Sequence, residues 1–404
     1  MRILKIVPQA FYSARGTPLS AYHRARELIA RGHEVDILTY AVGGEPPNCA
    51  ARVFRSRGPH FKRSIRAGPS RLKIWFDLLL FINLLARLAR QRYDVLYAHE
   101  EGALLARLAG AIFRIPYIYD MHSSLPLQIT DWKFSNRASV IAAFRWVERL
   151  SVRGACAVVA ISPAVARAAR SAGPDTLCVL LANHFEASDQ VVPREEVAAV
   201  RTRHGIPLER KLVVYAGSFV ALQALDLLLD AIPEVLASVP NTTFLLVGGS
   251  DPEITTLQAQ AARLRITDHV ILERSLPQSA IPAYLAAADV LVSPRVQGIN
   301  SPGKLLNYLA SGRPVVATDT LVHNQILTEK SAILTSPDAH GLAAGLVTAL
   351  TDPARVAEVV TGAGKLLGRY SSKTDRDEAY QTVLHAAQVA ALGRVRRGKS
   401  KTPA

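Results

Sequence analysis

The chain has 404 residues, 49% of them hydrophobic and 20% charged, and a formal net charge of +15. This composition excludes a disordered chain, and the length is too great for one ordinary core, so we expect two packed domains. The three cysteines lie far apart, which excludes a disulfide framework or a cysteine zinc site and is typical of a reducing cytosol.

Short apolar runs alternate with amphipathic stretches along the first half of the chain. The apolar run at the amino terminus ends at Pro8, which is too short for a secretory signal and indicates a first buried strand. Strands that are apolar on both faces and separated by helices predict an α/β fold with a parallel, doubly wound sheet. The predicted strands are 2–7, 34–39, 94–98, 116–119 and 157–161, and the predicted helices are 18–30, 72–91, 101–113, 137–152 and 163–172.

A basic segment without acidic residues spans positions 46–76 and leads into a leucine-rich helix. Asp77 and Arg87 interrupt that helix, which leaves too short an apolar run to cross a bilayer. Basic side chains beside an apolar helix face suit an anionic membrane surface, whereas nucleic acid is not expected because no aromatic residues are interleaved for base stacking. A solvated loop before an ordinary buried helix is the alternative. The residues predicted to contact the membrane are Arg63, Arg66, Arg71, Lys73 and Trp75.

The alternation restarts after a polar stretch and predicts a second domain of the same kind. The ligand site of two such domains is expected in the crevice at the carboxyl ends of both sheets. We expect a first domain at residues 1–185, a linker at 186–205, a second domain at 206–370, a carboxy-terminal helix at 371–392 and a disordered basic tail at 393–404. The predicted strands of the second domain are 211–216, 243–247, 269–272, 289–292, 314–317 and 332–334, and two late helices are predicted near 353–367 and 374–391.

The segment 293–319, SPRVQGINSPGKLLNYLASGRPVVATD, carries the strongest chemical signal. Pro302 suits the first turn of a helix that Ser301 would cap. Free N–H groups at the start of this helix, its dipole and the charge of Lys304 would form an anion site, with Asn307 one turn further on the same face. An ordinary capped helix of a βαβ unit is the alternative.

Polar residues follow the predicted strands of the first half, where strand ends face the expected crevice. His122 comes directly after the strand PYIYD, and we predict a functional role for it, with Asp120 fixing the local loop. His99, Glu100 and Glu101 end the neighbouring strand in the same way. One of the two glutamates is predicted to bind or deprotonate a substrate hydroxyl, and capping of the next helix is the alternative for Glu101.

These segments resemble the retaining glycosyltransferases of the GT-B fold that form glycosyltransferase family four. The resemblance covers about residues 1–335 in the expected order and implies two Rossmann-like domains that face each other across a cleft, with the acceptor on the first. Segment 293–319 resembles the donor-binding signature, 215–232 (YAGSFVALQALDLLLDAI) the opening of the sugar-nucleotide domain, and 246–253 (LVGGSDPE) its glycine loop. Segments 14–40, 93–106 and 118–126 resemble the opening loop and the acceptor-side strand ends.

The chain departs from the family's pattern at charged positions. The family's acidic pair would fall at Ile299 and Asn307, and its phosphate-binding Arg and Lys at Ser218 and Gln223. The sequence NSPGK at 300–304 matches members in which N-[ST]-P-x-K replaces the acidic pattern. The resemblance then implies donor binding by Gly16, Thr17, Ser218, Gln223, Arg295, Asn300, Ser301, Gly303, Lys304, Leu305 and Asn307, catalytic roles for His122 and Asp120, and acceptor binding by His99, Glu100 and Glu101.

The resemblance also implies transfer of a hexose-type sugar from a nucleotide-diphosphate donor to a hydroxyl acceptor, with retention of anomeric configuration. No metal and no cofactor are expected, because the only D-x-D, Asp375–Asp377, opens a predicted helix, where acids suit the dipole. The basic segment suggests a peripheral position on the cytoplasmic face of the membrane and a lipid-linked acceptor, and residues 371–392 would return to the first domain. A sugar-nucleotide epimerase of similar fold and a non-catalytic nucleotide-sugar-binding protein are the alternatives.

Overall fold

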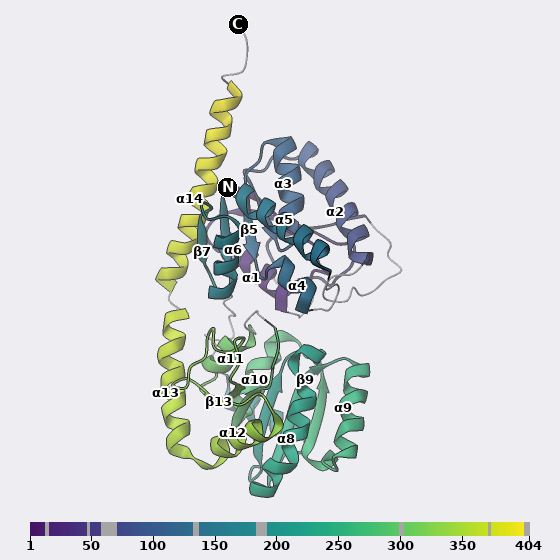
Figure 1. Cartoon of the computed structure of the whole chain (residues 1–404), viewed down its shortest axis with the longest axis vertical. Helices are drawn as coiled ribbons and strands as arrows, with labels where there is room; N and C mark the ends of the chain where they lie inside the picture. Colours follow the sequence, from purple (N-terminus) through teal and green to yellow (C-terminus); the bar gives the residue numbers. More distant parts are fainter. Residues whose placement is uncertain are drawn as a thin grey trace. The chain divides into compact units, whose positions relative to one another are not determined.

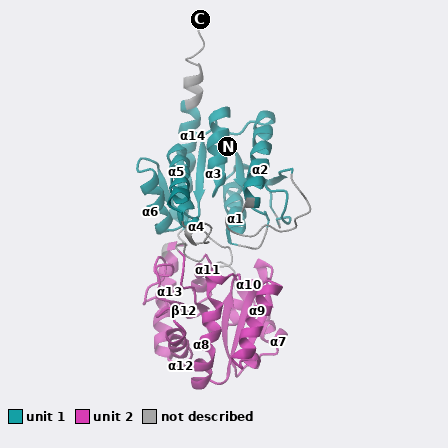
Figure 2. Cartoon of the chain, turned by 45° about the vertical axis from the view of Figure 1, so that its right-hand side comes forward, with its two compact units in different colours: residues 1–183, 373–404 teal, residues 184–372 magenta. Residues whose placement is uncertain are grey.

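The computed structural model describes residues 1–12, 16–46, 49–57, 71–131, 137–182, 192–298, 303–370 and 373–399. The chain divides into two compact units (Figure 2), called here unit 1 (residues 1–183 and 373–404) and unit 2 (residues 184–372). Each unit contains one sheet of parallel strands covered by helices (Figure 1), which confirms the predicted α/β class with two Rossmann-like domains.

Unit 1 contains a seven-stranded sheet in the order β3-β2-β1-β4-β5-β6-β7. The direction of the strand order reverses between β1 and β4, and open α/β sheets bind ligands at the carboxyl ends of the strands beside such a switch point. The strands are β1 (Arg2–Val7), β2 (Glu34–Thr39), β3 (Arg52–Arg55), β4 (Val95–His99), β5 (Tyr117–Met121), β6 (Ala157–Ala160) and β7 (Cys178–Leu180).

Helices cover both faces of this sheet. The helix α1 connects β1 to β2, toward one edge of the sheet, and the helices between β3 and β7 connect strands toward the other edge. Because such crossovers are right-handed, α1 lies on one face of the sheet and those helices lie on the other. The helices α2, α3, α5 and α6 pack against one another in that order. The carboxy-terminal helix α14 packs against β5, β6 and β7 and forms ion pairs with α1. The helices of unit 1 are α1 (Gly16–Ala30), α2 (Arg71–Arg90), α3 (Gly102–Phe113), α4 (Leu125–Asp131), α5 (Ala138–Gly154), α6 (Pro163–Ala172) and α14 (Lys373–Lys399).

Unit 2 contains a six-stranded sheet in the order β10-β9-β8-β11-β12-β13, with its switch point between β8 and β11. Apolar side chains on the two faces form two core clusters, one involving α8 and α12 and the other α10 and α11. The strands are β8 (Lys211–Ala216), β9 (Thr242–Gly249), β10 (Val270–Arg274), β11 (Val290–Ser293), β12 (Val315–Thr318) and β13 (Ile333–Thr335). The helices are α7 (Arg194–Arg203), α8 (Leu225–Ser238), α9 (Asp251–Arg263), α10 (Ile281–Ala287), α11 (Lys304–Ala310), α12 (Ala339–Thr351) and α13 (Pro353–Tyr370), with 3-10 turns η2 (Ala221–Gln223), η3 (Thr267–His269) and η4 (Gln278–Ala280).

The structure corrects several expected boundaries. The linker expected at 186–205 contains α7, whose hydrophobic pattern is weak because Val200 is its only fully buried side chain. β3 lies inside the basic segment, where Arg52 forms an ion pair with Asp36 of the adjacent β2. The tail expected from 393 is helical as far as Lys399, since an isolated glycine among good helix formers does not end a helix. Neither α4 nor β7 is among the predicted elements.

The close approach of α13 to the backbone of Lys330 in unit 2 can be tested by substitution of a glycine. Gly362 of α13 lies against Lys330, and a Cβ atom at this glycine would lie 1.7 Å from the lysine carbonyl oxygen. We expect Gly362→Ala to lower the free energy of unfolding by about 1–3 kcal/mol, because the backbone must move. Gly364→Ala in the same helix adds a Cβ with no atom within 4 Å and should leave stability unchanged or raise it by up to about 1 kcal/mol. Urea denaturation followed by circular dichroism measures both, and equal effects would contradict this packing.

Candidate active site

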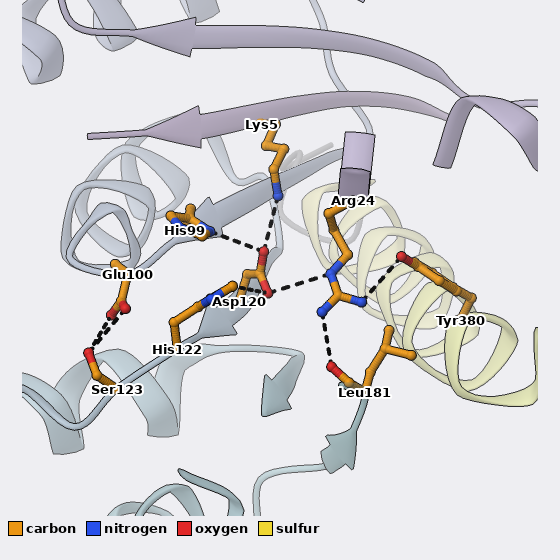
Figure 3. A network of polar contacts seen from close by, with 9 residues as sticks. All are labelled: Lys5, Arg24, His99, Glu100, Asp120, His122, Ser123, Leu181 and Tyr380. Carbon is orange, nitrogen blue, oxygen red and sulfur yellow. Dashed lines mark hydrogen bonds and ion pairs between the residues drawn. The ribbon is translucent and has the colours of Figure 1, made fainter. Parts of the chain in front are cut away.

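Asp120, at the end of β5, is the centre of a buried polar network in unit 1 (Figure 3). Its Oδ2 accepts a hydrogen bond from Lys5 Nζ at 3.1 Å and lies 3.2 Å from His99 Nδ1, while Oδ1 lies 3.2 Å from His122 Nε2. Arg24 of α1 adds an ion pair, with its Nε 3.8 Å from Oδ1. Burial alone would raise the pKa of Asp120, but Lys5, His122 and Arg24 hold it well below its usual value. Asp120 is therefore an ionised carboxylate.

The two histidines of this network are neutral. Burial and the neighbouring His122 lower the pKa of His99 to about 3, and burial lowers the pKa of His122 as well. A carboxylate only accepts hydrogen bonds, so each ring carries its proton on the nitrogen that faces Asp120. The other nitrogens, His99 Nε2 and His122 Nδ1, have no hydrogen-bond partner among the described residues. Each neutral ring thus keeps a free lone pair that can accept a hydrogen bond from a hydroxyl group.

Ligand atoms of His99, Asp120 and His122 lie within 4.8 Å of one another, which is the spacing of a possible metal site. The surrounding charges do not fit a divalent cation, because Lys5 and Arg24 already pair with the one carboxylate of the set. A metal ion here would lie beside two cationic groups. The D-x-D pair does not suit a metal either, because Asp377 forms an ion pair with Arg31.

The glutamates after β4 lie in a second polar group of unit 1. Glu100 has a left-handed backbone (φ 51°), and Ser123 Oγ lies 3.0 Å from both of its carboxylate oxygens. Burial and the charge of Glu101 raise the pKa of Glu100 well above its usual value. Glu101 stands at the N-cap position of α3, as the capping alternative expects, but its side chain makes no capping hydrogen bond and forms an ion pair with Lys73 of α2. Burial and Glu101 also raise the pKa of Asp77 to about 7.

The residues predicted to contact the membrane differ in their exposure in the structure. Lys73 is not a surface charge, because its ammonium group is paired with Glu101 and its side chain is only 19% exposed. Trp75 is 67% exposed and lies on a face of α2 with Ile74, Leu78 and Ile82, which are also exposed. Arg63 and Arg66 and the side chain of Arg71 lie outside the described residues. No helix in the described part of the chain has the length and apolar content needed to span a bilayer.

In unit 2 the first residue of α11, Lys304, places its ammonium group among neutral partners. Its Nζ donates to Gln223 Oε1 at 3.1 Å and lies 3.7 Å from the ring centroid of Tyr215. The described residues include no carboxylate in ion-pair contact with it. Burial and the charge of Arg295 lower the pKa of Lys304 well below its usual value. A cation in this setting is poorly compensated until an anion binds.

Arg295 follows β11 and is buried beside Lys304. Its Nε donates to the carbonyl of Gln297 at 2.8 Å, and its own carbonyl accepts a hydrogen bond from Thr318 Oγ1 at 2.6 Å. Gly298 has a φ of +102°, and a Cβ there would lie 2.1 Å from the Arg295 guanidinium. Glycine at this position therefore lets the loop close around the arginine.

The remaining predicted donor residues are placed as follows. Asn307 lies one turn after Lys304, is 8% exposed, and its Oδ1 has no hydrogen-bond partner among the described residues. The Leu305 side chain is fully buried in the core, so only its backbone could meet a ligand. Ser218 is exposed after β8, Gly16 and Thr17 begin α1, Gly303 precedes α11, and Asn300 and Ser301 lie outside the described residues.

His323 is a site residue that the sequence does not reveal. Its Nε2 lies 2.9 Å from Ser293 Oγ at the end of β11, and its Nδ1 donates to the carbonyl of Thr318 at 2.8 Å. Burial lowers its pKa to about 4, and Lys304 and Arg295 contribute. The ring thereby links the ends of β11 and β12. Its only sequence signal is a histidine shortly after a predicted strand.

His323 makes the stability of unit 2 depend on pH. Its pKa of about 4 in the folded protein is below its ordinary value of 6.5, so the unfolded chain binds the proton first as pH falls. Stability present above pH 6.5 is lost as pH falls toward 4, and the loss is about 2 kcal/mol at about pH 5. The His323→Gln variant has no imidazole at this position, so its free energy of unfolding should not show this decrease between neutral and acidic pH, whatever its value at neutral pH. Urea denaturation of both proteins at about pH 7 and about pH 5 checks it, and an equal loss in the two proteins would be contrary evidence.

Two family models match the chain. Residues 15–184 match "Glycosyl transferase 4-like domain", and residues 210–352 match "Glycosyl transferases group 1". The first match lies in unit 1 except for its last residue, and the second lies within unit 2.

Relatives and solved structures are similar to this chain, over about a third of it in one case and over most of it in the others. The GDP-mannose-dependent alpha-(1-6)-phosphatidylinositol monomannoside mannosyltransferase of Mycolicibacterium smegmatis is 36% identical over 137 residues, which are 32% of this chain and 35% of the relative. The phosphatidyl-myo-inositol mannosyltransferase of Mycobacterium tuberculosis is 25% identical over 92% of this chain and 93% of its own length. The crystal structure of Anabaena HepE in complex with UDP-glucose has a TM-score of 0.76 at 19% identity, over 95% of this chain and 100% of its own, which shows a shared fold.

Proposed function

We propose that this chain, which belongs to the group-1 glycosyltransferases of family four with the GT-B fold, transfers a hexose-type sugar from a nucleotide-diphosphate donor to a hydroxyl acceptor. The observation that carries the proposal is Lys304, whose ammonium group has no carboxylate partner among the described residues and lies beside a second cation, Arg295. A diphosphate supplies the missing negative charge and several strong hydrogen-bond acceptors.

The donor chemistry follows from the groups around Lys304. The lysine and Arg295 bind the diphosphate, and Asn307 uses its unpaired Oδ1 to accept a hydrogen bond from a ribose hydroxyl. The exposed Ser218 and the η2 residue Gln223 contact phosphate oxygens as neutral donors. One relative is named as dependent on GDP-mannose and one similar structure was solved with UDP-glucose, which supports a nucleotide sugar in kind.

The transfer itself proceeds with retention and without a metal in this proposal. The bond between the anomeric carbon and the diphosphate oxygen breaks, and the acceptor oxygen bonds to the same face of that carbon. The acceptor proton passes to the leaving diphosphate, so no enzymic nucleophile is required. Lys304 and Arg295 stabilise the charge that develops on the leaving group. His122 accepts a hydrogen bond from a hydroxyl of the transferred sugar through its unpaired Nδ1, and Asp120 holds the ring.

The acceptor binds the second polar group of unit 1. Glu101 forms an ion pair with Lys73, whereas the raised pKa of Glu100 favours the protonated form of Glu100. A carboxylate and a protonated carboxyl offer both an acceptor and a donor to acceptor hydroxyls. Two relatives are named for phosphatidylinositol-based acceptors, which supports a lipid-linked acceptor in kind.

A sugar-nucleotide epimerase needs acid and base groups aimed at the sugar, and the cluster of described residues around Lys304 contains no carboxylate contact. The test incubates the protein with labelled GDP-mannose or UDP-glucose and a membrane lipid extract. We expect label in the lipid fraction. Label in an altered free sugar nucleotide would indicate epimerisation, and saturable binding without turnover would indicate a non-catalytic protein; either outcome refutes transfer.

Lys304 sets the affinity for the nucleotide. Lys304→Met should weaken nucleoside-diphosphate binding by about 1.5–3 kcal/mol through loss of a charge-assisted contact. Because the lowered pKa of Lys304 rises when the anion binds, binding should take up protons and weaken as pH rises. Isothermal titration calorimetry in two buffers of different ionisation enthalpy measures both effects. Lys365→Met, at an exposed position of α13, is the control, and equal affinities of the two variants would refute the role.

We also propose that unit 1 binds an anionic membrane surface through α2, α3 and α5. The exposed side chains of these adjacent helices include Trp75, Ile112 and Trp146. Their only acids, Asp77 and Glu148, are engaged inside the protein, the first with Tyr40 and the second with Ser124 and the backbone of Leu125. The exposed basic residues on α3, α5 and the turn after α3 are Arg114, Arg145, Arg149 and Arg153. Apolar anchors among basic residues without competing acids suit anionic lipid headgroups.

Vesicle binding tests this surface. Trp75→Ser combined with Trp146→Ser should weaken binding to phosphatidylglycerol vesicles by at least about tenfold, since burial of one large apolar side chain contributes roughly 1.5–3 kcal/mol. Neutralising Arg63, Arg66 and Arg71 should cost about 1 kcal/mol each. The control is Leu208→Ser, which removes an 84% exposed apolar residue from unit 2. If both sets of variants sediment with vesicles as the control does, unit 1 does not bind membranes in this way.

A further inference from the structure

Arg24 connects three elements of unit 1 through one buried guanidinium (Figure 3). Its Nε pairs with Asp120 Oδ1 of β5 at 3.8 Å, and its Nη2 donates to the carbonyl of Leu181, just after β7, at 3.0 Å. Its Nη1 donates to the hydroxyl of Tyr380 in α14 at 3.3 Å. The contacts with Leu181 and Tyr380 therefore orient Arg24 toward Asp120, and neither contact involves His99 or His122.

We propose that Arg24 is a positioning residue for His122, and that α14 holds Arg24 in place through the Tyr380 hydroxyl. The inference rests on the proposed role of His122 in binding the transferred sugar. Neither Arg24 nor Tyr380 touches the reacting groups in this account. Both act through Asp120, whose Oδ1 is the atom that Arg24 and His122 share.

The charge distribution explains why the arginine matters to the histidine. Burial lowers the pKa of His122, Asp120 opposes this, and the charges of Arg24 and Lys5 lower it further. Without Arg24, Asp120 would pair with Lys5 alone, and its negative charge would favour an imidazolium at His122. An imidazolium has no free lone pair and could not accept a hydrogen bond from a sugar hydroxyl. The charged and titratable groups around His122 are Lys5 of β1, Arg24 of α1, Tyr97 and His99 of β4, Glu100 just after β4, Asp120 of β5 and Tyr380 of α14.

The carboxy-terminal helix is well fixed where it meets Arg24. Tyr380 is almost fully buried, and its ring lies 4.0 Å from the Arg31 guanidinium carbon. Arg31 forms an ion pair with Asp377, and Arg376 forms one with Glu27, so two ion pairs join α14 to α1 in the turn of α14 that precedes Tyr380. Since α14 follows α13 of unit 2 along the chain, docking of this returning segment reaches His122 through only two intermediate side chains, Arg24 and Asp120.

Lysine cannot take over this function. A guanidinium holds several donors in one rigid plane, so it can bond Leu181 and Tyr380 and still present Nε to Asp120. An ammonium group at the same place would keep the charge but lose the fixed direction. Arg24→Lys therefore separates charge from orientation, whereas Arg24→Met removes both.

The test follows His122 itself by NMR in full-length protein with ¹³C-labelled histidine, its resonance assigned from a His122→Asn spectrum. We expect the titration midpoint of His122 to rise in Arg24→Met and, by less, in Tyr380→Phe. The control is Tyr370→Phe, which removes a tyrosine hydroxyl that contacts Gln325 in unit 2 and should leave the midpoint unchanged. In transfer assays, kcat of Arg24→Met should fall roughly tenfold to a hundredfold through misplacement, with the acidic limb of its pH profile moved toward neutral pH.

An unchanged His122 midpoint in both Arg24→Met and Tyr380→Phe would overturn the proposal. If Arg24→Met fails to fold by circular dichroism, Tyr380→Phe decides alone, because it keeps the aromatic ring. A shifted midpoint in a protein that transfers no sugar would support this inference and refute the proposed function. An unshifted midpoint in a protein that transfers sugar would do the reverse.

Discussion

The ammonium group of Lys304 is held by an amide oxygen and an aromatic ring, with no carboxylate partner in the described part of the chain. The comparable buried cations of unit 1, Lys5 and Arg24, both pair with Asp120. Desolvation disfavours an uncompensated charge, so the Lys304 site is more stable with an anion than without one. The buried cations Lys5 and Arg24 of unit 1 are paired within the protein, whereas Lys304 of unit 2 has no carboxylate partner among the described residues, and the proposal that the donor diphosphate binds at Lys304 follows from that difference.

Much of the fold could be predicted because its physical basis is local and periodic. Apolar strands alternating with amphipathic helices predicted the α/β class, which the two parallel sheets confirm, and the resemblance of the motifs predicted the family, which the two family models confirm. The carboxyl ends of adjacent parallel strands must lie together. That rule alone places His99 beside Asp120, since β4 and β5 pair with these two residues in register. The chemical roles of these residues, and of the donor residues in unit 2, stay predictions.

The partners of the site residues could not be predicted because they come from distant parts of the chain. Lys5 stands in the apolar run RILKIV, and its partner Asp120 lies 115 positions away. Arg24 looks like one of many basic residues on an amphipathic helix, and only the packing of α14 shows why it is buried. The pairing of Lys73, a predicted membrane residue, with Glu101 could not be predicted for the same reason, because it has no sequence signal. Local patterns reveal elements and strand ends, but not which charges meet.

The most direct measurement is a crystal structure of the full chain with a bound nucleoside diphosphate, such as GDP or UDP. The account predicts a phosphate oxygen within hydrogen-bond distance of Lys304 Nζ, with the ammonium group turned away from Gln223 and the Arg295 guanidinium beside the diphosphate. A nucleotide bound elsewhere, or a bound diphosphate that makes no contact with Lys304 while the ammonium group still donates to Gln223, would contradict it.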